Sequence, residues 1–263
     1  MNKADLLDKT ARDGAERLLL ARVLDKLEHT QRRNIPTNTG FLSPAEQAAV
    51  EGLLRTAGAP EHLFLGGYPG AERAVCVFLP QWQSKEDFEA DSVLSALRCT
   101  FPEDTGLTHR DFLGAILGLG VTREKVGDLL VGPRSCDILV LPALADYLLL
   151  HLEGAGRVKL TCAPLALADL APPPVKKKEI RDTVATLRLD AVAAAGFSLS
   201  RSKAAGAISA GKVQLNYREC VKPDHTVAQG DVISCRGLGK CVVAQAGGQS
   251  KKGRILITLE RFC

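Results

Sequence analysis

The sequence predicts an α+β protein built from three successive parts. We expect an N-terminal helical segment with a β-hairpin over residues 1–85, a ferredoxin-like βαββαβ domain over 86–170, and a small α+β domain over 182–263. Three observations predict this organisation. Apolar residues recur at helical spacing near the N-terminus, strand and helix patterns alternate in the middle, and a proline- and lysine-rich segment at 171–181 precedes a C-terminal third of different charge.

Composition places the chain among globular proteins. Its 263 residues are 46% hydrophobic and 24% charged, values that exclude the disordered and fibrous classes. The longest stretch without a charged residue, Asn34 to Ala45, contains two prolines and is too short to span a bilayer. The first residues lack the apolar core of a signal peptide. We therefore expect a cytoplasmic protein that makes no membrane contact.

The N-terminal part combines helices with a hairpin. Residues Ala4 to Arg33 are predicted to form one amphipathic helix, which a stretch containing proline and glycine then ends. A second helix is expected to begin with Ser43 as its N-cap and Pro44 at its first position. The strands of the hairpin flank a glycine-rich turn and are expected at His62–Leu65 and Arg73–Leu79.

The middle part follows the order strand, helix, strand, strand, helix, strand. Thr108 is expected to cap the first of its helices. This order is the ferredoxin-like pattern, which supports many functions, including single-stranded RNA binding, and so does not decide among them. The predicted elements are Val93–Phe101, Asp111–Leu117, Asp128–Val131, Asp137–Leu141, Pro142–Leu152 and Arg157–Ala163.

Charge is distributed unevenly along the chain. The formal net charge is only +4, but residues from Lys176 onward hold 16 Lys/Arg and 7 Asp/Glu, whereas the first 175 residues hold 18 and 23. The C-terminal third thus has a formal net charge of +9, whereas the first 175 residues have a net charge of −5. The segment between them, 171–181, has three consecutive prolines and three lysines and is expected to be an extended linker. Such asymmetry predicts a module that binds a polyanion.

The C-terminal part is predicted to contain two short helices followed by strands. Ser200 is expected to cap the second helix, and Gly211 suits the left-handed position after it. The following strand alternates apolar and polar side chains. The predicted helices are Leu187–Ala195 and Arg201–Ala210, and the predicted strands are Lys212–Asn216, Val232–Arg236, Lys240–Ala244 and Arg254–Arg261.

Several short motifs of this part occur together in one order. They are Leu187-Arg188-Leu189-Asp190, Leu199-Ser200-Arg201-Ser202-Lys203-Ala204, Gly211-Lys212-Val213, Leu215-Asn216 and Gly230-Asp231-Val232-Ile233. In order and spacing they resemble the alpha-L RNA-binding module, also called the S-four domain. At Gly237-Leu238-Gly239-Lys240 the sequence departs from that module, where an aromatic residue and an arginine are expected. Lysine keeps the charge but lacks the planar fork of arginine, which leaves a bidentate phosphate contact at Lys240 in doubt.

The front of the chain carries motifs that resemble the bacterial YlmH-type proteins. They are Gly66-Gly67-Tyr68, Ala71-Glu72-Arg73, His109-Arg110-Asp111-Phe112-Leu113-Gly114, Gly118-Leu119-Gly120, Gly127-Asp128 and Ala145-Asp146-Tyr147. The resemblance spans essentially the whole chain. It implies a middle RNA-binding domain before the C-terminal module, binding to the ribosome and tRNA, a role in rescuing stalled large subunits, and a cell-division gene neighbourhood.

Candidate RNA-binding residues follow from the resemblance and from what phosphates require, which is cations and amide donors on a rigid platform. The first set is Arg188, Ser200, Arg201, Lys203, Lys212, Asn216 and Lys240. Secondary candidates are Arg110, Lys176, Lys177, Lys178, Lys251 and Lys252.

Structural alternatives stay open for five of these positions. Arg201 could instead pair with Asp190, Lys203 could simply be solvated, and Asn216 could be a turn residue. Lys251 and Lys252 could form a solvated hairpin tip.

Metal, cofactor and disulfide sites are not expected. None of the eight cysteines forms a C-x-x-C pair and most lie in apolar stretches, so they are interpreted as small buried hydrophobic residues. The segment Gly206–Lys212 matches G-x-x-x-x-G-K. However, Val213 replaces the Ser/Thr that would bind magnesium, and the helix precedes the strand, so a nucleotide site is not predicted.

These observations predict a non-catalytic, monomeric RNA-binding protein that binds rRNA or tRNA on the large ribosomal subunit. The first alternative is an RNA-modifying enzyme that uses the C-terminal module to deliver its substrate, although the front 175 residues show no obvious acid–base constellation. The second alternative is an adaptor linked to cell division, which would leave the basic third unexplained.

Overall fold

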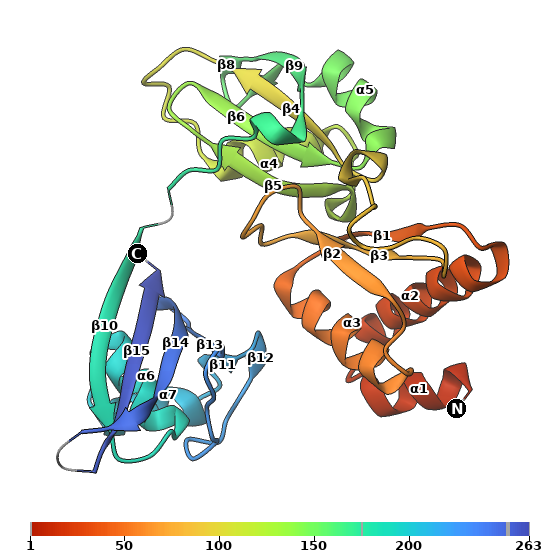
Figure 1. Cartoon of the computed structure of the whole chain (residues 1–263). Coiled ribbons are helices and arrows are strands. Elements are labelled where there is room, and N and C mark those ends of the chain that lie inside the picture. Colours follow the sequence, from red (N-terminus) through yellow and green to blue (C-terminus); the bar gives the residue numbers. More distant parts are fainter. Residues whose placement is uncertain (1, 175, 251–252, 263) are drawn as a thin grey trace. The chain divides into compact units, whose positions relative to one another are not determined.

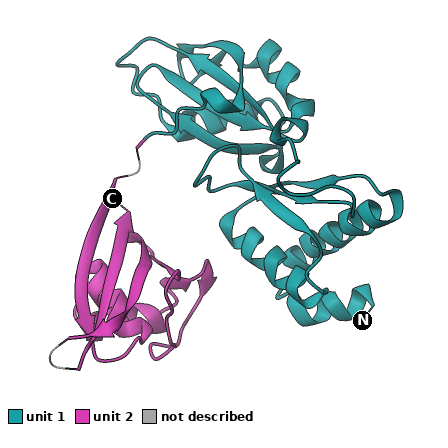
Figure 2. Cartoon of the chain, in the orientation of Figure 1, with its two compact units in different colours: residues 1–173 teal, residues 174–263 magenta. Residues whose placement is uncertain are grey.

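The computed structural model describes residues 2–174, 176–250 and 253–262. It confirms a mixed α+β architecture and divides the chain into two compact units, residues 1–173 and 174–263 (Figure 2). Among the described residues, no helix is both long and apolar enough to cross a membrane.

The first unit begins with three helices and a three-stranded antiparallel sheet of order β1-β3-β2 (Figure 1). Its elements are α1 (Lys3–Thr10), α2 (Gly14–Arg33), β1 (Thr37–Leu42), α3 (Pro44–Thr56), β2 (His62–Leu65) and β3 (Ala74–Phe78). The predicted hairpin is β2–β3, and the predicted cap at Ser43 is confirmed because its side chain accepts a hydrogen bond from the Glu46 N–H. Strand β1 was not expected.

The single helix predicted over residues 4–33 is wrong. Two helices occupy this segment, and the second begins at Asp13, whose carboxylate accepts a hydrogen bond from the Glu16 N–H at 2.8 Å. The side chain of Asp13 satisfies a backbone donor that an uninterrupted helix would pair internally. A good N-cap followed by glycine therefore outweighs the apolar periodicity here.

The second half of the first unit is a four-stranded antiparallel sheet of order β5-β6-β4-β9. Its strands are β4 (Ser95–Thr100), β5 (Val126–Val131), β6 (Ser135–Val140) and β9 (Thr161–Leu165), with helices α4 (His109–Gly118) and α5 (Pro142–His151) between them. The last strand, predicted at 157–163, lies at 161–165 instead. A short hairpin precedes it, formed by two strands of two residues each, β7 (Gly154–Ala155) and β8 (Val158–Lys159).

Two apolar clusters meet at strand β3, and one of them reaches the middle sheet. Cys76 and Phe78 on β3 face the cluster formed with α1–α3, whereas Val75 and Val77 face a second cluster that includes Leu139 of β6. Strand β3 is thus buried on both sides, which explains its uninterrupted apolar sequence.

The second unit is a six-stranded sheet of order β10-β15-β14-β13-β11-β12, with two helices packed against its core (Figure 1). Its elements are β10 (Lys177–Val184), α6 (Leu189–Phe197), α7 (Arg201–Ser209), β11 (Val213–Leu215), β12 (Arg218–Glu219), β13 (Val232–Cys235), β14 (Gly239–Gln249) and β15 (Ile255–Phe262). The linker expected up to residue 181 is shorter, because β10 begins at Lys177 and pairs with β15 over its whole length.

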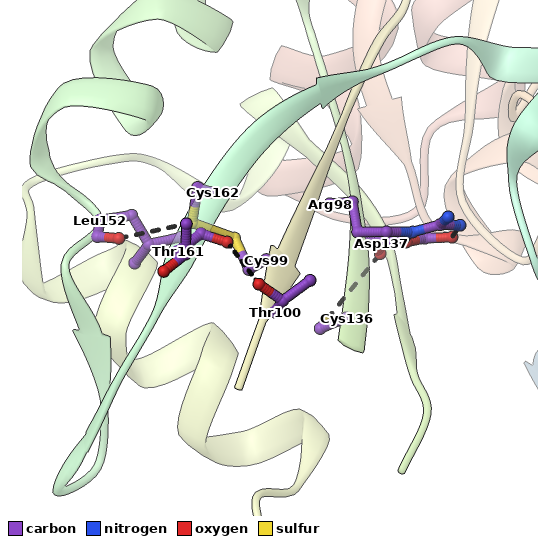
Figure 3. Close-up of a disulfide and its surroundings, with 8 residues drawn as sticks. All are labelled: Arg98, Cys99, Thr100, Cys136, Asp137, Leu152, Thr161 and Cys162. Atoms are coloured by element: carbon purple, nitrogen blue, oxygen red, sulfur yellow. Dashed lines mark hydrogen bonds and ion pairs between the residues drawn. A yellow bond between two sulfur atoms is a disulfide. The ribbon is translucent and has the colours of Figure 1, made fainter. Parts of the chain in front are cut away.

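One disulfide corrects the expectation that the cysteines are all unpaired. Cys99 on β4 lies opposite Cys162 on β9 in the antiparallel register, with their Cα atoms 4.1 Å apart, and the two are bonded (Figure 3). Their separation of 63 residues hides this pairing from any argument based on spacing. Of the free cysteines that the structure describes, Cys76, Cys136, Cys235 and Cys241 are buried. The described residues contain no group of His, Cys, Asp or Glu that could hold a metal ion.

Candidate RNA-binding surface

The start of helix α7 places exposed cations at a capped helix N-terminus. Ser200 caps the helix by accepting a hydrogen bond from the Lys203 N–H at 3.3 Å. Arg201 and Lys203, in the first turn, are both exposed. The partial positive charge of a helix N-terminus and these two side chains therefore act in the same direction, and both favour an anion.

A buried carboxylate holds two of the candidate arginines in place. Asp190 is 5% exposed, and its oxygens accept hydrogen bonds from Arg188 Nε and Nη2 at 3.3 and 3.1 Å and from Arg201 Nη2 at 3.3 Å. Burial alone would raise the pKa of Asp190, but the bonds from the two guanidinium groups outweigh it and hold that pKa below its ordinary value. The arginine side chains remain 39% and 56% exposed, so each can still offer donors to a ligand.

Lys212 and Arg236 lie together where β11 begins and β13 ends. Lys212 is exposed, and its carbonyl accepts a hydrogen bond from the Arg236 N–H at 2.9 Å. Arg236 is also exposed and was not among the predicted contacts. Only the pairing of Val213 with Cys235 brings these two cations together, and residue types alone did not reveal that register.

Asn216 is a turn residue in the structure. Its φ is +50°, a left-handed conformation that asparagine tolerates better than most residues. Its side-chain amide donates to Asp231 Oδ1 at 2.8 Å, while its side-chain oxygen accepts from the Val232 N–H at 2.9 Å. Both ends of the side chain thus serve the turn, which supports the structural alternative for this candidate.

The remaining described candidates of the second unit lie on or next to β10 and β14. Lys177 and Lys240 place their ammonium groups over the ring of Phe262, at 5.1 and 4.6 Å from its centroid. Lys176 and Lys178 are exposed. Lys251 and Lys252 lie outside the described residues.

Arg110 belongs to the first unit, where it is exposed in the first turn of α4. The helix starts at Thr108, whose N–H and hydroxyl donate to the Asp111 carboxylate at 2.8 and 2.6 Å. Hydrogen bonding from Thr108 accordingly lowers the pKa of Asp111. His109-Arg110-Asp111 thus forms a helix start, and the Arg110 side chain is exposed there.

Three of the motifs quoted for the first unit, those containing Tyr68, Arg73 and Asp128, meet in a polar cluster. Asp128 accepts hydrogen bonds from the Tyr68 hydroxyl at 2.8 Å and from the N–H groups of Glu72 and Arg73 at 2.7 and 3.1 Å. The Tyr68 pKa is raised by burial and by the bond to Asp128. We refer to Tyr68, Glu72, Arg73 and Asp128 as the Asp128 clamp.

Arginine side chains extend this clamp to the backbone of both halves of the unit. Arg73 donates to the carbonyls of Phe41 at 2.7 Å and Val126 at 3.1 Å. Burial and the neighbouring Arg73 lower the pKa of Arg123 to about 10. These motif residues therefore connect the N-terminal sheet to the middle sheet, and their role in the fold was not foreseen.

Comparisons with known proteins bear on both units. Residues 84–169 match the family model described as "Putative RNA-binding domain in YlmH", and residues 187–233 match the S4 domain. The chain is 32% identical over 248 residues to the "Ribosome-associated protein quality control protein P2" of Bacillus subtilis (strain 168), an alignment that covers 94% of this chain and 95% of the relative. The chain belongs to the YlmH family of RNA-binding proteins with a C-terminal S4 domain.

A solved YlmH structure shares the fold. The "Cell division protein ylmH from Streptococcus pneumoniae" superposes with a TM-score of 0.52 at 18% identity, over 60% of this chain and 95% of that one. Within the second unit the S4 match ends at Ile233, inside β13. Strands β10, β14 and β15 of this YlmH protein thus lie outside the matched segment.

Proposed function

We propose that this YlmH protein is a non-catalytic RNA-binding factor that acts on the ribosome. Its ligand would be rRNA, tRNA or both on the large subunit. Its role would lie in the rescue or quality control of stalled translation. The name of the Bacillus relative supports ribosome association. Action on ribosomes would place the protein in the cytoplasm.

The observation that carries this proposal is the arrangement at the start of α7. Arg188 and Arg201 converge on one buried carboxylate, and Lys203 lies in the same helical turn as Arg201. This presents several cations from fixed positions within the segment that matches an S4 domain. Fixed cations at a helix N-terminus suit the phosphates of a folded RNA, which can be recognised through its backbone and 2′-hydroxyls.

We further propose that the middle domain is ferredoxin-like. Two observations support this assignment. The strands form an antiparallel sheet of order β5-β6-β4-β9, and the helices lie between β4 and β5 and between β6 and β9 in the chain. The exposed Arg110 on α4 would give this domain a cation for RNA.

The test compares the wild type with a double variant, Arg201→Gln with Lys203→Gln, in co-sedimentation with purified ribosomal particles. We expect the variant to stay in the supernatant at physiological salt, because both lost charges face the phosphates. A control variant, Arg218→Gln with Arg254→Gln, removes two charges elsewhere in the unit and should sediment like the wild type. Equal sedimentation of all three proteins would refute the role of α7.

The enzyme alternative has its own test. A modifying enzyme predicts that RNA from a deletion strain loses one modified nucleoside, whereas the proposed binding factor predicts an unchanged nucleoside profile. The adaptor alternative predicts that residues 1–170 alone restore growth of that strain, and complementation measures this directly.

A further inference from the structure

The antiparallel sheet of the second unit gathers distant residues at one end of its strands. Lys178 at the start of β10 pairs with Arg261 at the end of β15, which also pairs with Cys241 near the start of β14. The end of β13 pairs with the start of β14 and with the start of β11. Figure 1 shows the start of β10 beside the end of β15.

Six cations lie at this end of the sheet, and we call them the strand-end rim. They are Lys177, Lys178, Lys212, Arg236, Lys240 and Arg261. They come from five neighbouring strands or the turns next to them, although 84 positions separate the first from the last. At about 4.8 Å between neighbouring strands, the rim is roughly 19 Å long.

Aromatic rings fix part of the rim. Lys177 and Lys240 both lie over the ring of Phe262, and the guanidinium carbon of Arg261 lies 5.7 Å from the centroid of the Phe197 ring. Arg261 also donates to the carbonyl of Leu238 at 3.2 Å. Cations held over rings lose less conformational freedom when they meet a ligand than cations on mobile side chains do.

Some carboxylates lie near the rim. Glu260 pairs with Lys177 at 2.8 Å, and Glu179 pairs with Arg181 at 2.6 Å. The Glu219 carboxylate lies beside Gly211, next to Lys212 in the chain. Lys178, Lys212 and Arg236 are exposed. Among the described residues, the rim therefore has more cations than nearby carboxylates.

We propose that the strand-end rim is a second contact for the RNA backbone, in addition to the start of α7. This inference rests on the proposed function and deepens it. Except for Lys212, all rim cations lie outside the segment that matches the S4 domain. Strands β10, β14 and β15 thus extend the RNA-binding surface of that domain, and the ligand they take is a run of phosphates read without regard to base sequence.

The test measures the affinity for unfractionated bacterial transfer RNA as a function of salt concentration, with the full chain. The rim variant carries Lys178→Gln and Arg236→Gln, two exposed positions whose replacement should leave the fold intact. Loss of two phosphate contacts should reduce the slope of log K against log salt by about 1.4–1.8, and affinity at 0.1 M salt by about 25- to 60-fold. Circular dichroism and thermal melting verify folding.

Controls separate the rim from overall charge and from the proposed function. The Arg218→Gln, Arg254→Gln variant removes two charges at the opposite strand ends and should keep the wild-type slope. The Arg201→Gln, Lys203→Gln variant measures the α7 contact with the same RNA.

If the α7 variant weakens binding and the rim variant does not, the rim proposal is overturned while the proposed function stands. If the opposite-end control weakens binding as much as the rim variant, the effect is net charge and the rim proposal also fails. If the wild-type chain binds no RNA, both proposals fail.

Discussion

Replacing Asp190 with asparagine should loosen the α7 site without unfolding the protein. The Asp190 side chain is 7% exposed, and its carboxylate accepts bonds from both Arg188 and Arg201 at 3.1–3.3 Å. Hydrogen bonds to charged groups contribute about 1.5–3 kcal/mol each when buried, but both arginines keep contact with water, which reduces the loss. We expect Asp190→Asn to destabilise the local structure of α6 and α7 by about 1–3 kcal/mol.

The stabilisation from Asp190 should depend on pH in one direction. Its pKa is lower in the folded protein than in the unfolded chain, where about 3.9 is usual. The unfolded state therefore takes up the proton first as the pH falls. The difference in the free energy of unfolding between wild type and Asp190→Asn should have its largest value above about pH 4. It should shrink as the pH falls through the lower pKa that Asp190 has in the folded protein.

Hydrogen exchange followed by mass spectrometry measures this effect locally. Amides of α6 and α7 in the Asp190→Asn variant should exchange about 5- to 150-fold faster, which corresponds to 1–3 kcal/mol. Asp182→Asn, an exposed carboxylate of the same unit, is the matched control and should exchange like the wild type. Fluorescence of Trp82, the single tryptophan, reports on the first unit and should not change. Unchanged protection in α6 and α7 would show that the carboxylate does not organise the two arginines.

Two further predictions concern the first unit. Asp128→Ala leaves a hydroxyl and two backbone donors without their acceptor and should destabilise the unit by about 2–4 kcal/mol, whereas Tyr68→Phe, which removes one bond, should cost about 1–2 kcal/mol. Urea unfolding followed by Trp82 fluorescence measures both changes, and equal midpoints for the two variants would contradict the clamp. A reductant should lower the urea midpoint of the oxidised chain by breaking the Cys99–Cys162 bond, which closes a long loop and contributes about 2–4 kcal/mol. Cys162→Ser should abolish this response to reductant, and a response that persists in the variant would rule out the bond.

Local signals predicted the elements that depend on local chemistry. The helix that Ser43 caps and the β2–β3 hairpin follow from a serine–proline pair and a glycine-rich turn, and both could be predicted from a few neighbouring residues. Strand β1 and strand β10 could not, because each is defined by pairing with a partner far along the chain. The split between α1 and α2 was missed because the cap at Asp13 competes with a helical pattern that continues through it.

The candidate site shows the same division. The resemblance to the S4 domain pointed to Arg188, Arg201 and Lys203, and the alternative that Arg201 pairs with Asp190 is the arrangement that the structure contains. Arg236 was missed because only the register of β11 and β13 places it beside Lys212. Motif residues do not all serve the ligand either, since Asp128 connects two sheets of the first unit.

Strand β10 is synthesised well before the strand with which it pairs. It is translated about 70 residues before β15, its neighbour in the described part of the sheet, and at roughly 5–20 residues per second the wait lasts several seconds. During that time β10 is an unpaired strand that other nascent chains could extend into an intermolecular sheet. Its composition answers this hazard, because Lys177, Lys178, Glu179, Arg181 and Asp182 make five of its eight residues charged. The same lysines that suit a polyanion thus keep the strand soluble until its partner arrives.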